Sequence, residues 1–197
     1  MKAVLLTSLL GLLLLHCNPA TSSAQMVPAA DQIAGAVQAA PEDLRDGARV
    51  IGFDANGAYT DLRVGENELV CLADDPSRDG FNVACYHASI EPFMAMGREL
   101  RAQGMDNQTV RTRRYAAADS GELPMPETPA ALYVLTGDSF DAATGTVENR
   151  FLRYVIYTPY ATAESTGLAT SPAGPLQPWL MYPGTAGAHV MITPARD

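Results

Sequence analysis

Hydrophobic and polar residues alternate in short runs along most of the chain, and this pattern predicts a protein built largely of strands. The runs are rich in Val, Ile, Leu, Tyr and Phe and are separated by Gly, Pro, Asn and Asp. Period-two alternation with such residues is typical of β-strands. Strands are expected at 49–53, 58–64, 68–72, 81–86, 110–115, 131–136, 150–158 and 188–193.

One long segment, 89–103, follows helical spacing instead. Its apolar residues recur every three or four positions, as on one buried helix face: Ile90, Phe93, Met94, Gly97 and Leu100. Ser89 is a candidate N-cap and Gly104 a stop. An alanine-rich stretch at 31–40 predicts a short helix. The expected fold is therefore α+β, with a small mixed or antiparallel sheet packed against one main helix.

The first residues have the layout of a secretory signal. Lys2 precedes an apolar run from Ala3 to Leu15, and small residues lead up to Ala24, after which cleavage is expected. Cys17 offers an alternative, a lipid anchor. We expect export to the periplasm or the extracellular space. The predicted organisation is a signal peptide at 1–24, a leader with a short helix at 25–45 and a single α+β domain at 46–197.

Charge narrows the class of partner. The chain has 13 basic and 22 acidic residues and a net charge of −9. Because phosphate backbones require a basic surface, a nucleic-acid partner is not expected. No apolar run after the signal is long enough for a transmembrane segment. A small molecule or an envelope component remains as a partner, and the oligomeric state stays open.

Two cysteines, Cys71 and Cys85, remain after the predicted cleavage. In an oxidising compartment a pair at this spacing predicts a disulfide, and Pro76 with Asp79-Gly80 marks a turn that brings two strands together. The alternative is a free thiolate pair.

Two histidines, His87 and His189, raise the possibility of a metal site. Alternation places His189 and Met191 on one face of the last strand. If His87 faced the same pocket, the three side chains could bind copper, or the histidines with Glu91 could bind zinc. In the alternative interpretation each histidine is a separate, half-buried residue and no cofactor is bound.

The stretch "LYVLTGDSFD" at 132–141 resembles the nucleophile block of GDSL-type hydrolases, in which the serine of the triplet attacks an ester. The resemblance implies a nucleophilic role for Ser139. The chain departs from that family because the block lies late in the sequence and the terminal Asp-x-x-His element is absent. His189 would have to act as the base. A degenerate serine hydrolase is thus one alternative function.

Five arginines lie close together in the sequence, at Arg98, Arg101, Arg111, Arg113 and Arg114. Their planar guanidinium groups could hold a carboxylate or a phosphate. In a chain this acidic, we interpret them instead as partners of surface Asp and Glu.

The segment 177–192 gathers aromatic, thioether and imidazole groups around a Pro-Gly turn, after a long loop at 165–178. Such groups line apolar binding pockets. The same composition also describes a packed sheet edge. The candidate ligand-binding residues are His87, Trp179, Tyr182, His189 and Met191.

Taken together, "GENELVCL", "ACYHASIEPFMAMGRELRAQG" and "PWLMYPGTAGAHVMI" resemble segments of exported bacterial proteins without an assigned activity. The resemblance implies export, one domain and importance of the terminal His-x-Met segment. We expect a non-enzymatic binding or envelope-associated module. The alternatives are a metal-binding protein or metal-assisted enzyme, a degenerate hydrolase, and a purely structural envelope protein.

Overall fold

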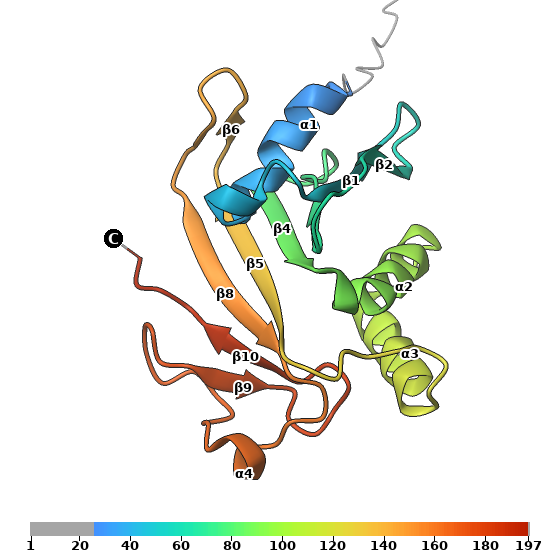
Figure 1. Cartoon of the computed structure of the whole chain (residues 1–197), viewed down its shortest axis with the longest axis vertical. Helices are drawn as coiled ribbons and strands as arrows, with labels where there is room; N and C mark the ends of the chain where they lie inside the picture. Colours follow the sequence, from blue (N-terminus) through green and yellow to red (C-terminus); the bar gives the residue numbers. More distant parts are fainter. Residues whose placement is uncertain (1–25, 197) are drawn as a thin grey trace, which may run out of the picture.

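The computed structural model describes residues 26–196. The predicted signal peptide, the cleavage after Ala24 and the lipid anchor at Cys17 lie outside these residues. Within the described range the chain forms an eight-stranded sheet, a separate two-stranded sheet and four α-helices (Figure 1).

The helices and strands alternate irregularly along the chain. The α-helices are α1 (Ala29–Ala36), α2 (Glu91–Ala102), α3 (Asn107–Asp119) and α4 (Ala163–Thr166). Short 3-10 turns are η1 (Val37–Ala39), η2 (Glu42–Leu44) and η3 (Ala88–Ile90). The strands are β1 (Arg49–Phe53), β2 (Tyr59–Arg63), β3 (Leu69–Leu72), β4 (Phe81–His87), β5 (Ala130–Gly137), β6 (Phe140–Asp141), β7 (Thr146–Val147), β8 (Phe151–Tyr157), β9 (Trp179–Met181) and β10 (His189–Ile192).

The large sheet has the order β2-β1-β3-β4-β5-β8-β10-β9. The pair β1 and β3 is parallel, and every other neighbouring pair is antiparallel. This confirms an α+β fold with a mixed sheet. The sheet is larger than the small one expected, because the C-terminal strands β9 and β10 join it beside β8.

The predicted disulfide is present. Cys71 on β3 lies directly opposite Cys85 on β4 in the strand register, and the two sulfur atoms are bonded. Both residues are fully buried. The bridge therefore fixes the pairing of two central strands from inside the core.

Side chains on the two faces of the sheet form two separate cores. Cys85, Val83 and Leu135 pack beneath α1 and η1, which lie across the face seen in front in Figure 1. Tyr86 and Val155 point to the opposite face and pack with Phe93 of α2. Helices α2 and α3 lie side by side on this second face, towards one end of the sheet (Figure 1).

The prediction of a strand at 110–115 was wrong, because these residues belong to α3. Asp106 supplies the N-cap, with its carboxylate accepting from the backbone N–H groups of Gln108 at 2.8 Å and Thr109 at 3.0 Å. Thr, Val and Tyr favour strands by themselves, but the cap and the alanines that follow favour a helix. The second face therefore carries a helix pair rather than one main helix.

Between β5 and β8 the chain forms a small hairpin, β6 and β7. Phe140 of this hairpin stacks on Phe81 with ring centroids 5.2 Å apart. The hairpin thereby extends the core beneath α1.

No helix in the described part of the chain is both long and apolar enough to span a bilayer.

Removing the disulfide should lower stability without changing the fold. A bridge that closes a loop of this length, with a sequence separation of 14, contributes about 3 kcal/mol in the chain-entropy account. Urea unfolding of the double variant Cys71→Ala, Cys85→Ala should show a lower midpoint than the oxidised protein. The wild type reduced with dithiothreitol should shift in the same direction, and an unchanged midpoint after reduction would contradict this role.

Candidate functional site

His87 ends β4 and is exposed. Its Nδ1 lies 2.8 Å from Ser89 Oγ and accepts from the backbone N–H of Ser89 at 3.2 Å. The ring therefore caps the short turn that precedes α2. Because side chains alternate along a strand, His87 lies on the same face of the sheet as Cys85.

His189 begins β10 and is buried on the other face. Its ring stacks on that of Tyr157, with centroids 5.1 Å apart, and Tyr157 belongs to the core beneath α2. Strands β5 and β8 separate β4 from β10. The structure thus does not bring His87 and His189 together. In the described residues, no three His, Cys, Asp or Glu side chains form a group able to hold a metal.

The other three predicted ligand-binding residues lie close to His189. Trp179 is opposite Met191 in the register of β9 and β10. The ring of Tyr182 lies 5.8 Å from the ring of His189 and meets it edge on. Four of the predicted residues therefore form one neighbourhood, and His87 stands apart from it.

Ser139 lies far from this neighbourhood. It follows the end of β5, where its hydroxyl donates to Glu148 Oε2 at 3.1 Å. His189 pairs with Tyr157, which is opposite Ala130 at the start of β5. The length of β5 separates the two ends by roughly 23 Å. Ser139 and His189 are thus not arranged as a nucleophile and its base.

A pocket of about 300 Å³ lies where α2 and α3 meet the ends of β8 and β10. It is lined by three arginines, Arg101, Arg111 and Arg114, with Phe93, His189 and three tyrosines. Among the described residues, no acidic side chain contributes to the lining. The pocket is thus basic and aromatic in a chain whose net charge is −9.

Two of the arginines bind only neutral groups. Arg101 Nε donates to Asn107 Oδ1 at 3.4 Å. Arg111 Nη1 donates to Tyr182 Oη at 3.2 Å, and its guanidinium lies 5.2 Å from the centre of that ring. Within the described range, neither arginine forms an ion pair. No carboxylate of residues 26–196 therefore pairs with their positive charges.

Arg114 is the most buried of the three. Its guanidinium lies 4.1 Å from the centre of the Phe93 ring, and Nη1 donates to the carbonyl of Phe93 at 3.3 Å. Its Nε is buried and has no hydrogen-bond partner in the part of the chain described. Burial lowers the pKa of Arg114 below its usual value. An anion in the pocket would supply the negative charge that this side chain lacks among the described residues.

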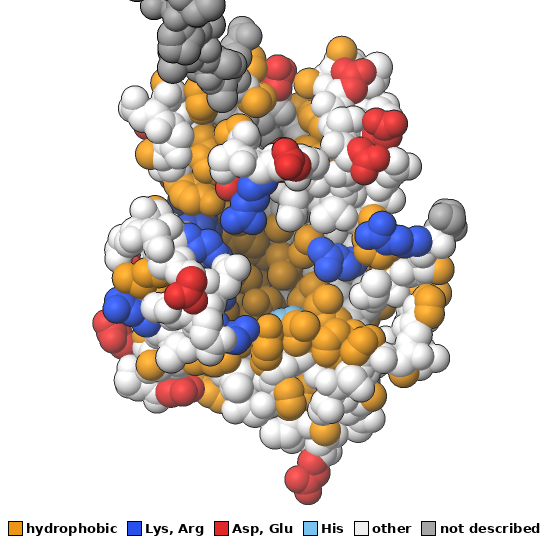
Figure 2. Space-filling view, turned by 180° about the vertical axis from the view of Figure 1, so that it is seen from behind, with side chains coloured by type: hydrophobic (Ala, Val, Ile, Leu, Met, Phe, Trp, Pro, Cys, Tyr) orange, Lys and Arg blue, Asp and Glu red, His pale blue; other side chains and the backbone are white. Residues whose placement is uncertain are grey.

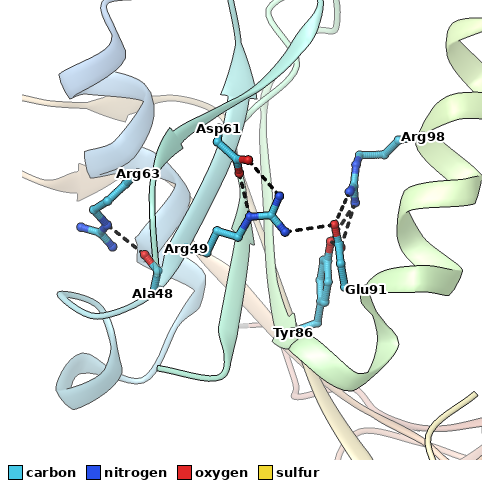
Figure 3. Close-up of polar contacts among 7 residues, drawn as sticks. All are labelled: Ala48, Arg49, Asp61, Arg63, Tyr86, Glu91 and Arg98. Carbon is cyan, nitrogen blue, oxygen red and sulfur yellow. Dashed lines mark hydrogen bonds and ion pairs between the residues drawn. The ribbon is translucent and has the colours of Figure 1, made fainter. Parts of the chain in front are cut away.

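The arginines on the other side of α2 behave differently (Figure 3). Arg98 Nη2 lies 2.6 Å from Glu91 Oε1, and Arg49 Nε lies 2.7 Å from Asp61 Oδ1. Tyr86 donates to Glu91 Oε2 at 2.5 Å, and burial raises the pKa of this tyrosine. This network joins β1, β2, β4 and α2. Its charges are paired, as the sequence interpretation expected of Arg98 and the four other arginines grouped with it.

Two glycines make room for the basic pocket. A Cβ added to Gly97 would lie 3.1 Å from Arg114 Nη1 and 3.3 Å from Arg101 Nη1. A Cβ on Gly187 would overlap Tyr115 Oη. The backbone at both positions is thus open to side chains that approach from α2 and α3.

Tyr182 has a left-handed backbone, with φ of 54°. This conformation costs a bulky residue about 1–3 kcal/mol and persists only where surrounding contacts hold it. Here the hydrogen bond from Arg111 and the edge contact with His189 hold the ring at the pocket. Pro183 and Gly184, which form a turn, come directly after Tyr182 in the sequence.

Two other hollows differ from the basic pocket because acidic side chains contribute to their lining. A groove of about 650 Å³ runs between α2 and the β1–β2 hairpin, next to the paired network of Figure 3. A smaller pocket of about 260 Å³ lies beside α1 and includes Phe81 and Phe140 in its lining. Arg101 lines both the groove and the basic pocket.

The sequence pattern contained a signal for this site that the strand assignment obscured. Asn107, Arg111, Arg114 and Tyr115 occur at helical spacing, so they share one face of α3. As a helix, this segment directs its polar and aromatic side chains to one place.

Comparison of the chain with protein-family models, with curated proteins and with solved structures gave no match.

The hydrogen bond of His189 fixes its tautomer. Nδ1 lies 2.7 Å from the carbonyl oxygen of Gly187. A carbonyl only accepts, so Nδ1 carries a proton, and Nε2 is the unprotonated nitrogen of the neutral ring. Burial lowers the pKa of His189, and the bond to Gly187 offsets part of that effect.

This lowered pKa predicts a loss of stability in mild acid. Between the folded pKa and the unfolded value near 6.5, the unfolded chain binds a proton that the folded chain does not. The contribution of His189 is therefore present above 6.5 and declines as pH falls towards the folded pKa. The free energy of unfolding, measured by urea at pH 7.5 and pH 5.5, should fall less in His189→Gln than in the wild type.

His87→Gln is the matched control, because it removes an exposed histidine that caps a turn. Between the two pH values, the free energy of unfolding should fall more in this variant than in His189→Gln. An equal slope in the wild type and in His189→Gln would show that the buried ring does not resist protonation.

Proposed function

We propose that the protein is a binding module for a small organic anion, held in the pocket between α2, α3 and the start of β10. One observation carries the proposal. Three guanidinium groups line one pocket without an acidic partner among the described residues, although the chain is strongly acidic. Arginines in such a chain have many carboxylates available as partners, and Arg98 has one.

The chemistry of the lining favours a carboxylate or a phosphate as the charged group. Guanidinium groups donate through a planar fork that matches the oxygens of either. Tyr115, Tyr157 and Tyr182 supply ring faces and hydroxyl groups beside it. Burial raises the pKa of Tyr157 to about 12, so this hydroxyl stays protonated and does not repel an anion.

The module is proposed to act outside the cytoplasm, as the signal-like residues 1–24 lead us to expect. We propose a binding role rather than a catalytic one, because the arginines and aromatic rings that line the pocket are groups that hold and orient a ligand. Four residues of the site foreseen from the sequence support the same location: His189 and Tyr182 line the pocket, and Met191 and Trp179 adjoin it on β10 and β9.

Replacing one arginine should weaken anion binding. Benzoate and inorganic phosphate are the probes, and titration calorimetry at low salt is the measurement. Arg111→Gln should lower the affinity for benzoate roughly tenfold or more, since a charge-assisted hydrogen bond is lost. Added sodium chloride should weaken binding of both probes.

Arg113→Gln is the matched control, because it removes the same charge from an exposed position of α3 outside the pocket. It should leave the affinity unchanged. Benzamide, which lacks the charge of benzoate, should bind much more weakly. Equal losses in the two variants, or equal affinities for benzoate and benzamide, would overturn the proposal.

A further inference from the structure

The sheet face next to the basic pocket is only partly covered. Helices α2 and α3 pack over one end of it, and beyond them lie half-buried hydrophobic residues of the central strands: Leu72, Leu132, Val134 and Met191. Figure 2 shows this side of the molecule hollowed, with hydrophobic side chains on the floor, basic side chains around it and a histidine at its edge. Lys2 is the only lysine, so the basic groups described are arginines.

The strand register connects this floor to the pocket. His189 and Tyr157 form the row at the pocket. Two residues further along, the next row on the same face contains Met191, Val155 and Leu132. Side chains of adjacent rows lie on one continuous surface, so the apolar floor follows directly after the row that lines the pocket.

The floor has a defined length. The following row pairs Val134 with Arg153. Arg153 Nε is buried and has no hydrogen-bond partner within residues 26–196. From Tyr157 to Arg153 the strand advances four residues, which is roughly 13 Å. The apolar path therefore ends at a second cationic side chain after about this distance.

We propose that the ligand is a free fatty acid of medium chain length, with its carboxylate at Arg111 and Arg114 and its acyl chain on the floor formed by β5, β8 and β10. The inference rests on the proposed anion-binding function and adds the class of ligand. Charge complementarity identifies the occupant: Arg101, Arg111 and Arg114 lie at one end, and the path from them as far as Arg153 is neutral and apolar.

The chain-length dependence of binding follows from this geometry. Full burial of a methylene group strengthens binding about fourfold, so a floor open on one side gives roughly twofold for each methylene. The gain should continue until the chain reaches Arg153, at on the order of ten carbons. Longer chains should gain little more.

Titration calorimetry with butyrate, hexanoate, octanoate, decanoate and dodecanoate below their micellar concentrations tests the proposal. Val134→Thr keeps the shape of the side chain and adds a hydroxyl to the floor. It should weaken decanoate binding roughly fivefold and leave butyrate binding unchanged. Val64→Thr is the control, because Val64 is 84% exposed, and it should change neither. Thermal unfolding of each variant establishes that it is folded.

The outcomes separate the two proposals. Affinity that rises with chain length, with every acid weakened by Arg111→Gln, supports both. Equal affinity for butyrate and decanoate, still dependent on Arg111, overturns the fatty-acid inference and leaves anion binding intact. Affinity that rises with length but is unaffected by Arg111→Gln and is matched by decanol overturns anion binding, and the inference with it.

Discussion

The central strands β4 and β5 carry apolar side chains on both faces, so each face has to be covered by another layer. One face is closed by α1, η1 and the β6–β7 hairpin, and the disulfide between Cys71 and Cys85 lies inside that core. The other face is covered at one end by α2 and α3. What these helices leave open is an apolar surface beside a group of arginines, and the candidate site follows from this incomplete coverage.

The arginines on the two sides of α2 differ in whether they have an acidic partner. Arg98 is paired with Glu91 and joins the helix to the sheet, so its charge serves the fold. Arg114, one helix away, is buried against Phe93, and its Nε has no hydrogen-bond partner within residues 26–196. Leaving a buried donor unpaired costs about 1–3 kcal/mol. The guanidinium also has no carboxylate partner among the described residues, which is a physical reason for the pocket to prefer an anion.

Much of the fold could be predicted from the sequence, because its strongest signals are local. Alternation in 49–53 and 150–158 gave strands close to those observed, and helical spacing gave α2. The disulfide followed from cysteine count and a turn. The strand assigned to 110–115 failed because β-branched and aromatic residues conflicted with the Asp106 cap, and the cap prevailed once α2 offered a packing surface.

The site itself could be predicted only in part, since it combines residues about 80 positions apart in the sequence. Alternation placed His189 and Met191 on one face, but nothing local shows that β10 pairs with β8 or that α3 faces it. Across that gap, Arg111 donates to Tyr182, whose left-handed backbone is held by this contact and by His189. The pocket wall thus couples a regular helix to a strained turn. An anion bound to Arg111 would accept hydrogen bonds from the same guanidinium group that donates to Tyr182. Ligand binding and the backbone conformation at Tyr182 are therefore expected to be linked.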